Sequence, residues 1–291
     1  MSSDNYLKFG ELSLYRLGSD LASASKDLID GAADGIFINT SGDYKFDNLN
    51  CLQQLPKFKA LAMVGELSDT TIISSMTWLE HLSTEPAKVK NPSLNALVNL
   101  KSLSITLGPE LQLPCVYLPS LKTLRVWSLK DKNLDCLKFF PDIEDLIVIQ
   151  ASHLENLHGL RHCLKLRKVD IGYCPKLENT SGLLSCVNLI EVELTNLKRI
   201  KSLDSIYQLT KLQRLIVKNV PSVKNISGMT KLKSLQHLAW IETEIEDGDL
   251  SPLLEMPNLA HCHVRPNKKH YQPTATYLYD TIKARSLLKD Y

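Results

Sequence analysis

A short apolar pattern, L-x-x-L-x-Φ, recurs along most of the chain, where Φ is an apolar residue. Clear copies begin at Leu189, Leu212 and Leu235. Alternating apolar and polar positions over a few residues predict a β-strand with one buried face, so each copy predicts one strand. Aligned on their second apolar residue, the copies lie 21 to 24 residues apart, at Leu61, Leu82, Leu103, Leu124, Leu146, Val169, Val192, Leu215, Leu238 and Cys262. The segment GIFIN, around Ile36, predicts one earlier strand.

The segments between these strands show a different period. Apolar or small residues recur at every third position, and one repeat reads Leu177, Thr180, Leu183, Cys186 and Leu189. An α-helix turns every 3.6 residues and would drift away from a strict period of three. Short 3₁₀ turns and extended segments match that period. We therefore expect little regular α-helix between the strands.

The repeat as a whole resembles the leucine-rich-repeat family over residues 34 to 267. Repeats of that family have about 20–29 residues and the form L-x-x-L-x-L-x-x-N/C-x-L. The chain departs from this form at the ninth position, where only Cys174 fits and the other repeats carry Val220, Leu197, Ala151 and Leu129. The resemblance implies an α/β fold: a curved, horseshoe-shaped leucine-rich-repeat solenoid. A parallel sheet of about 10–11 strands would line its concave face, with short 3₁₀ or irregular segments on the convex face.

The two ends of the chain are expected to cap the array. A repeat buries its leucines only against its neighbours, so the terminal repeats need a cover. Residues 1–33 predict an N-terminal cap, with a strand-like segment followed by a short helix near Leu21–Ile29. Residues 268–291 predict a C-terminal cap, in which Thr274 to Leu288 form a helix. With the array at 34–267, the whole chain is expected to form one continuous domain.

The strand alternation also predicts which side chains are available to a partner. If the fourth and sixth positions of the pattern point into the core, the third, fifth and seventh point to the concave side. In the middle of the array these positions, with one eighth-position tyrosine, combine aromatic, apolar and charged residues, the types that dominate binding hot spots. The predicted partner-binding residues are Arg125, Trp127, Asp145, Ile147, Ile149, Lys168, Asp170, Tyr173, Glu191, Glu193, Arg214, Ile216 and Lys218. The alternative is that the isoleucines only favour β-structure and are covered by a cap or loop.

Composition and charge narrow the class of protein. Hydrophobic residues make up 44% and charged residues 23%, and the formal net charge is +2. These values are ordinary for a well-packed soluble chain, and without a basic stripe we expect no nucleic-acid partner. The N-terminus lacks the features of a secretory signal, and no apolar run approaches the roughly 18–20 residues of a membrane helix. We therefore expect a cytoplasmic protein without a membrane partner, in which most of the seven cysteines are reduced core residues.

Candidate catalytic and metal-binding motifs are weak. His261, Cys262 and His263 are consecutive, but a strand would place the two histidines on one face and the thiol on the other. Asp247-Gly248-Asp249 is better explained as a turn than as a calcium loop. The chain has no phosphate-binding loop, no G-x-S-x-G and no paired C-x-x-C sites. We expect no enzyme activity, no cofactor and no bound metal.

These observations favour a non-enzymatic scaffold that binds another protein on the concave face of the solenoid. The repeat style resembles stand-alone cytoplasmic leucine-rich-repeat proteins of bacteria with internalin-like repeats. The most specific hypothesis is an immunity protein that binds and occludes a toxin. The alternative is a regulatory or adaptor subunit that docks on a cellular enzyme such as a phosphatase. An exposed sheet face would also serve a homodimer, so the sequence leaves the oligomeric state open.

Overall fold

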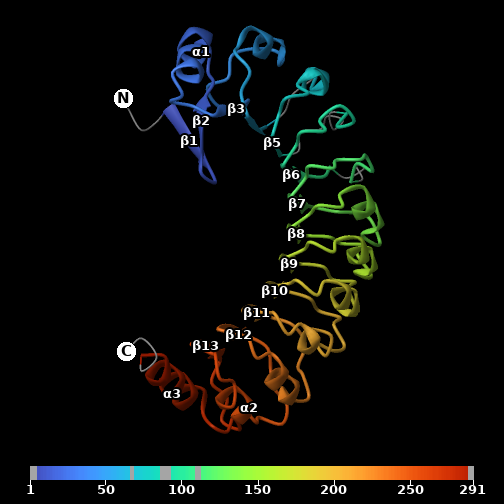
Figure 1. Cartoon of the computed structure of the whole chain (residues 1–291), viewed down its shortest axis with the longest axis vertical. Coiled ribbons are helices and arrows are strands. Elements are labelled where there is room, and N and C mark those ends of the chain that lie inside the picture. The colour runs from blue at the N-terminus through green and yellow to red at the C-terminus, as the bar shows by residue number, and fades with distance from the viewer. Residues whose placement is uncertain (1–4, 66–68, 86–92, 109–112, 288–291) are drawn as a thin grey trace. The chain divides into compact units, whose positions relative to one another are not determined.

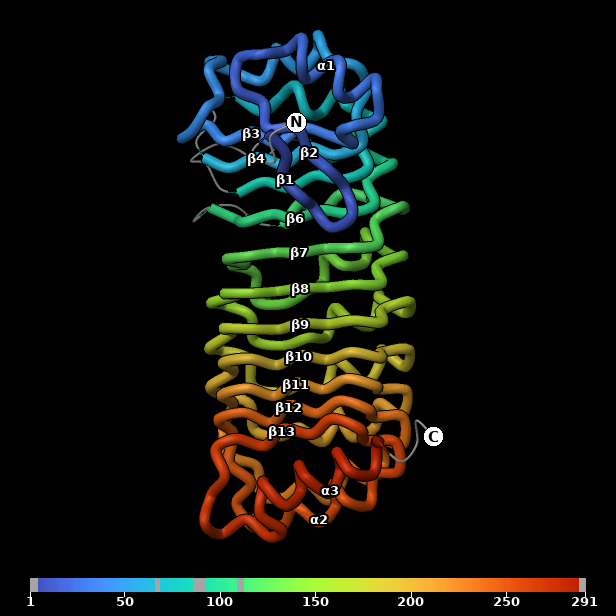
Figure 2. Tube along the Cα trace, turned by 90° about the vertical axis from the view of Figure 1, so that its left-hand side faces the viewer, coloured from blue at the N-terminus to red at the C-terminus, as the bar shows by residue number. Residues whose placement is uncertain are grey.

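The computed structural model describes residues 5–65, 69–85, 93–108 and 113–287. The chain divides into two compact units, Met1–Ser128 and Leu129–Tyr291, and each is described by itself. Figures 1 and 2 show the strands of both units and the turns that connect them.

The first unit begins with an antiparallel hairpin and continues with parallel strands. β1 (Tyr6–Phe9) pairs with β2 (Leu12–Arg16) in the hairpin. From β2 onward each strand pairs in parallel with the next one in the chain. The remaining elements are α1 (Leu21–Ile29), β3 (Gly35–Asn39), η2 (Asn50–Gln54), β4 (Ala60–Val64), η3 (Thr71–Ser75), β5 (His81–Thr84), β6 (Ser102–Thr106) and β7 (Thr123–Trp127).

The second unit repeats a strand and a short turn with little variation. Its strands are β8 (Asp145–Ile149), β9 (Lys168–Gly172), β10 (Glu191–Thr195), β11 (Arg214–Lys218), β12 (His237–Ile241) and β13 (His261–Arg265). They form one parallel sheet in chain order. The connections hold η4 (Asp135–Phe139), η5 (His158–His162), η6 (Ser181–Ser185), η7 (Ile206–Gln208), η8 (Ser227–Lys231) and α2 (Ser251–Leu254), and α3 (Ala275–Leu287) ends the unit. Within this unit the strands line the inner side of a bend and the 3₁₀ turns its outer side (Figure 1).

The register predicted from the sequence is confirmed in both units. Leu61 pairs with Leu82, and Leu238 pairs with Cys262. All other predicted neighbours within a unit also pair without a slip. These aligned side chains are buried, and a slip of one residue would turn every one of them toward the other face of the sheet. Thirteen strands lie in the described residues: the eleven predicted ones and the two of the N-terminal hairpin.

A side chain at the start of each outer turn helps to set its geometry. The Oδ1 atoms of Asn156, Asn179 and Asn225 accept the backbone N–H groups two residues later, at 3.1, 3.2 and 3.2 Å. An asparagine that caps its own backbone in this way starts a tight turn, and a 3₁₀ turn follows each of the three. The expectation of short 3₁₀ segments in place of α-helix is therefore confirmed.

The N-terminal hairpin covers the exposed side of β4 in the first unit. Leu14, Ala60 and Ala62 form a buried cluster, against which apolar side chains of the hairpin such as Phe9 and Leu12 are packed. Both views place the hairpin on the strand side of this unit (Figures 1 and 2). Ala60 and Ala62 are thus covered, and the face of β4 is not open to a partner.

The last helix closes the C-terminal end of the second unit. α3 packs on β13 and α2 and buries Ala275, Leu278 and Ile282. The guanidinium group of Arg285 donates hydrogen bonds to the carbonyl oxygens of Leu254 and Leu259, at 2.9 and 3.0 Å. Both predicted helices are found, α1 over the predicted range and α3 one residue inside it at its start; Leu288 lies outside the described residues. Within the described residues, no helix combines the length and the apolar character needed to span a bilayer.

Candidate binding surface

The exposed side of β8 to β11 carries three rows of side chains. In each strand the second and fourth residues are buried, whereas the first, third and fifth are at least partly exposed except for Gly172. Strand pairing aligns the exposed positions across the sheet. The first row is Asp145, Lys168, Glu191 and Arg214; the middle row is Ile147, Asp170, Glu193 and Ile216; the last row is Ile149, Gly172, Thr195 and Lys218.

The first row forms a network of ion pairs within the protein. Glu191 lies between two cations, with its Oε2 3.3 Å from Lys168 Nζ and its Oε1 3.0 Å from Arg214 Nε. Exposed pairs of this kind contribute about 0–1 kcal/mol each. Their larger effect is to hold three long side chains in fixed positions beside the middle row.

The middle row brings two carboxylates together without a cation between them. Asp170 and Glu193 are directly paired across β9 and β10, and like charges in that position repel each other. The Oδ1 atom of Asp170 is buried and accepts no hydrogen bond from the residues that the structure describes. Burial, followed by the negative charges of Glu193, Asp145 and Glu191, raises the pKa of Asp170 to about 6. At neutral pH this row therefore holds an ionised acid in an environment that disfavours its charge.

Tyr173 follows directly after β9, three residues beyond Asp170, and has an unusual backbone conformation. Its side chain is 53% exposed, and its φ angle is +56°. The eighth position of six successive repeats adopts such a left-handed conformation, and in the next two repeats it is occupied by Asn196 and Asn219. Asparagine tolerates this region, whereas a bulky residue is strained there. The tyrosine is therefore placed at a position that backbone preference alone would give to a smaller residue.

The strain at Tyr173 predicts the outcome of a substitution. We expect Tyr173→Asn to raise the free energy of unfolding by up to about 1 kcal/mol, because it removes an exposed aromatic ring and relieves the left-handed backbone. Urea denaturation of the two proteins measures the difference. Tyr277→Asn on α3, where the tyrosine is similarly exposed but helical, is the control and should give no gain. A loss of stability in Tyr173→Asn would show that the ring itself supports the fold.

Comparison with solved structures identifies the fold. The chain is similar to an internalin, inlF, from Listeria monocytogenes, with a TM-score of 0.53 and 18% identity over 86% of this chain and 66% of the internalin. It is similar to TLR13 in a complex with ssRNA13, with a TM-score of 0.56 and 17% identity over 86% of this chain and 42% of that one. A third similar structure is the LRR ectodomain of the receptor kinase GASSHO1/SCHENGEN3 from Arabidopsis thaliana bound to CASPARIAN STRIP INTEGRITY FACTOR 2. Its TM-score is 0.53, with 19% identity over 80% of this chain and 29% of that one.

The chain has the leucine-rich-repeat fold. At these identities the similarity establishes the fold and nothing finer. The chain spans less than two thirds of the length of each of these leucine-rich-repeat structures. No protein-family model and no curated protein matches the sequence.

The residues predicted to bind a partner fall in both units of this leucine-rich-repeat protein. Eleven of the thirteen lie in the second unit, ten of them in the three rows and Tyr173 directly after β9. The other two, Arg125 and Trp127, are half-buried residues of β7 in the first unit. The isoleucines of the rows are half-buried, and their role in binding stays a prediction.

The charge of the exposed face changes along the second unit. Acidic residues are concentrated on β8 to β10, whereas β11 to β13 carry Arg214, Lys218, Arg265 and a cluster of three histidines. The rings of His237 and His261 stack at 4.5 Å with an interplanar angle of 7°. Burial, followed by His261 and Arg214, lowers the pKa of His237. A partner that covers this leucine-rich-repeat face would meet an acidic part and a basic part in a fixed order.

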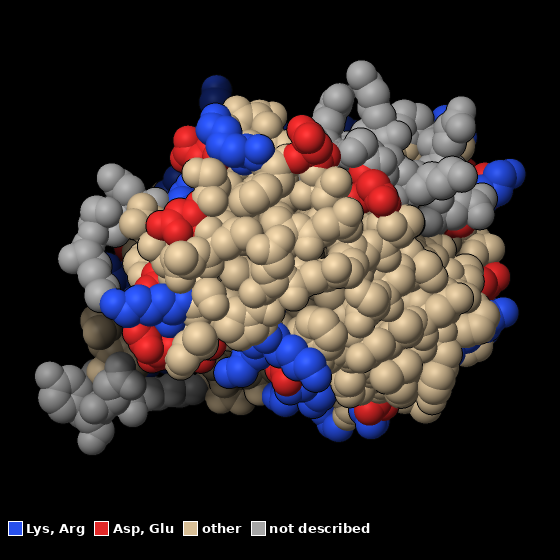
Figure 3. Space-filling view, turned by 90° about the horizontal axis from the view of Figure 1, so that it is seen from above, with Lys and Arg blue, Asp and Glu red and all other residues tan. Residues whose placement is uncertain are grey.

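The end of the molecule at the top of Figure 1, where α1 and the first strands lie, shows a different surface. Figure 3 looks down on it and shows a broad area without lysine, arginine, aspartate or glutamate, with acidic and basic groups interspersed around the margins. On this face the charges therefore do not gather into a stripe of one sign.

The thiols and imidazoles of the described residues do not assemble a reactive centre. Cys262 is buried, while its neighbours His261 and His263 are exposed on the other side of the strand, as the alternation predicted. Burial raises the pKa of the Cys163, Cys186 and Cys262 thiols to about 12, which leaves them protonated and poor nucleophiles at neutral pH. No group of three or more His, Cys, Asp or Glu side chains in the described residues is arranged to hold a metal ion. Gly248 has a φ angle of +70°, which confirms the turn predicted there.

Proposed function

We propose that this chain is a non-enzymatic scaffold that binds another protein on the exposed side of β8 to β11. The proposal is carried by the buried Oδ1 of Asp170, which has no hydrogen-bond partner in the described residues, together with the exposed and strained Tyr173 three residues later. Both features are unfavourable in the free protein. A partner that inserts a lysine or arginine at Asp170 would neutralise its buried charge. An apolar group of the partner packed on Tyr173 would bury the exposed aromatic ring.

Two further observations support a protein as the partner. The face combines apolar side chains, such as Ile147 and Ile216, with the charged first row, and mixed surfaces of this kind are typical of protein interfaces. Among the similar structures, the Arabidopsis ectodomain is in complex with a protein factor, whereas TLR13 is in complex with RNA. The acidic middle row would repel phosphate groups, which disfavours RNA on this part of the present chain.

The finer proposal is that the chain is an immunity protein that occludes a toxin. Enzymes that act on nucleic acids present a basic cleft to their substrate. The carboxylates of Asp170 and Glu193 resemble a pair of phosphate charges, and a preorganised acidic surface would fill such a cleft with fast, electrostatically steered association. Occlusion requires no chemistry from the binder. This proposal places the chain in the cytoplasm with its toxin; an adaptor on a host enzyme would instead require that the partner stay active when bound.

The proposed interface can be tested by affinity capture with matched variants. Immobilised wild-type protein, Tyr173→Ala and Tyr277→Ala would each be exposed to lysate of the source cells and to the products of neighbouring genes. Tyr277→Ala removes an equally exposed tyrosine from α3. We expect one protein to bind wild type and Tyr277→Ala but to bind Tyr173→Ala at least tenfold more weakly, as for a hot-spot residue. Equal capture by Tyr173→Ala would place the interface elsewhere.

The immunity proposal has its own readout. Expression of the captured protein alone should arrest growth of a host cell, and co-expression of the wild-type chain should restore it. A variant with Tyr173→Ala should fail to restore growth at the same level of expression. If the captured protein is harmless, or keeps its activity in the complex, the toxin proposal is wrong and the adaptor alternative gains support.

A further inference from the structure

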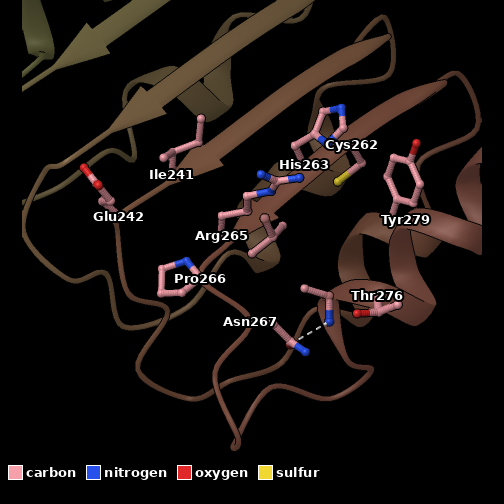
Figure 4. Close-up of a pocket in the computed structure, with 11 residues that line it drawn as sticks. Ile241, Glu242, Cys262, His263, Arg265, Pro266, Asn267, Thr276 and Tyr279 are labelled. Atoms are coloured by element: carbon pink, nitrogen blue, oxygen red, sulfur yellow. Dashed lines mark hydrogen bonds between the residues drawn. The ribbon is translucent and has the colours of Figure 1, made fainter.

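A pocket of about 790 Å³ lies at the C-terminal end of the exposed sheet face, where α3 meets β12 and β13. Ile241 and Arg265, which pair across the two strands, form one wall. Thr276 and Tyr279 of α3 form the opposite wall, and Pro266 lies in the loop between them (Figure 4). The predicted partner-binding residues do not line this pocket, which begins at Ile241 of β12, one strand beyond β11.

The guanidinium group of Arg265 is the unusual feature of the pocket. The side chain is exposed and, within the described residues, it takes part in no ion pair or hydrogen bond. Nearby cations are engaged: Lys268 pairs with Glu244 at 2.5 Å, and Arg285 donates to backbone carbonyls. Figure 4 shows the guanidinium extending over the pocket toward His263, while Glu242 lies at the far edge and points away. A planar cation so placed is suited to bidentate binding of a carboxylate.

The opposite wall adds the aromatic ring of Tyr279, which lies near an imidazole and an ammonium group. The centroid of the Tyr279 ring lies 5.3 Å from that of the His263 ring. The Nζ atom of Lys283, also on α3, lies 5.7 Å from the centroid of the Tyr279 ring. The apolar side chains of Ile241, Pro266 and Ala275 line the same space. The pocket thus combines an apolar lining with the guanidinium group of Arg265, and its volume exceeds that of a single side chain.

We propose that this pocket binds an acidic side chain of a peptide segment, together with an apolar side chain next to it in the sequence. The carboxylate would pair with Arg265, and the apolar side chain would pack between Ile241 and Tyr279. The charge complementarity rests on Arg265, with Lys283 near the Tyr279 ring, so a lysine-rich segment is disfavoured. This site is separate from the proposed interface and uses different residues. It binds an acidic group of the partner, whereas Asp170 would bind a basic one. A partner that reaches both would be held in one orientation along the face.

The test uses a defined peptide and the intact protein. The probe is the acetylated and amidated tetrapeptide Leu-Glu-Phe-Glu, and its controls carry glutamine or lysine in place of both glutamates. Binding is measured by two-dimensional amide NMR titration, with an expected Kd on the order of 1 mM for so short a ligand. We expect shifts centred on the pocket amides and at least fivefold weaker binding of both control peptides.

Variants separate a pocket from a diffuse electrostatic effect. Arg265→Gln should weaken binding of the acidic peptide at least fivefold, and Thr276→Phe, which adds a ring to an exposed position of the wall, should block it. Lys218→Gln is the matched control, because Lys218 lies in the same row of the sheet as Arg265, two strands away, and its substitution removes the same charge. This variant should change the affinity less than twofold. Urea denaturation checks that each variant is folded.

Each alternative outcome would overturn the assignment. Equal binding of the glutamine peptide, an unchanged affinity in Arg265→Gln, or equal losses in Arg265→Gln and Lys218→Gln would each exclude a carboxylate pocket. The probe titration is repeated with Tyr173→Ala, in which the affinity should be unchanged. The pocket and the proposed interface on β8 to β11 can therefore fail independently.

Discussion

Replacing Gly182 by valine is expected to lower the free energy of unfolding by about 3 kcal/mol, the upper part of the range for overpacking a close contact. Gly182 is a buried residue of η6. A Cβ atom added there would overlap the backbone carbonyl of Leu157 in the preceding repeat. Backbone atoms cannot rotate away as a side chain can, so the two neighbouring turns would have to separate.

The same contact recurs one repeat earlier, which makes the effect a property of the stacking and not of one site. A Cβ atom at Gly159 would overlap the carbonyl oxygen of Leu134. Urea denaturation followed by circular dichroism measures the loss in Gly182→Val. Ser181→Ala, at the exposed residue beside it, is the control and should change the free energy of unfolding by less than about 0.5 kcal/mol. A loss of similar size in both variants would contradict the stacking explanation.

Asp170→Asn is expected to stabilise the free protein while weakening its binding to a partner. The pKa of Asp170 is raised from an ordinary 3.8 to about 6 by burial and by the surrounding carboxylates. A shift of that size corresponds to roughly 3 kcal/mol, but Asp170 is only partly buried and solvent screens the interaction. We therefore expect a gain of about 1 kcal/mol at pH 7 from removal of the charge.

The direction of the pKa shift of Asp170 determines how the stability difference between Asp170→Asn and wild type changes with pH. Below the ordinary pKa of 3.8, Asp170 is protonated in both the folded and the unfolded states, so it imposes no penalty. Between pH 3.8 and about 6 the folded state binds more protons, and the stability contributed by this group falls as the pH rises. Above pH 6 the full penalty remains. The difference in stability between Asp170→Asn and wild type should therefore grow from pH 4 to pH 6.5 and then stay constant.

Two measurements test the prediction for Asp170. Urea denaturation at a series of pH values gives the difference curve, and Asp280→Asn, at an exposed residue of α3, should give a flat one. Parallel curves for Asp170→Asn and wild type would show that Asp170 is not destabilised by its surroundings. For the captured partner we expect at least tenfold weaker binding to Asp170→Asn, since a buried pair with a cation would be lost. A residue that destabilises the free protein but strengthens a complex is typical of a functional site.

Much of the repeat architecture could be predicted from the sequence because it depends on local periodicity. The spacing of Leu215 from Val192 and Leu238 fixes the register of their strands, since each strand can bury its apolar residues in only one alignment. The period of three between strands excludes long α-helices for an equally local reason. The direction of the side chains in the three rows follows from the same alternation.

The accessibility of each face could not be predicted in this way. Ala60 and Ala62 point to the predicted side of their strand, but the N-terminal hairpin packs over them. The sequence predicted that the last helix caps the array, but the pocket at Arg265 depends on which residues of α3 lie against β13, and the spacing of apolar residues does not state that. The penalty at Asp170 depends on Glu193, which is distant in sequence but adjacent in the sheet. These features arise from contacts between segments far apart in the chain.

By itself, the sequence determined the leucine-rich-repeat fold, the strand register, the 3₁₀ turns and the positions of the two cap helices, because each repeat contacts mainly its neighbours and the pattern is written at a fixed spacing. The tertiary structure alone decided which parts of the sheet are covered, which carboxylate is left without a cation, and where α3 completes a pocket. Those properties depend on burial and on charges brought together across strands, and neither is encoded in the spacing of apolar residues.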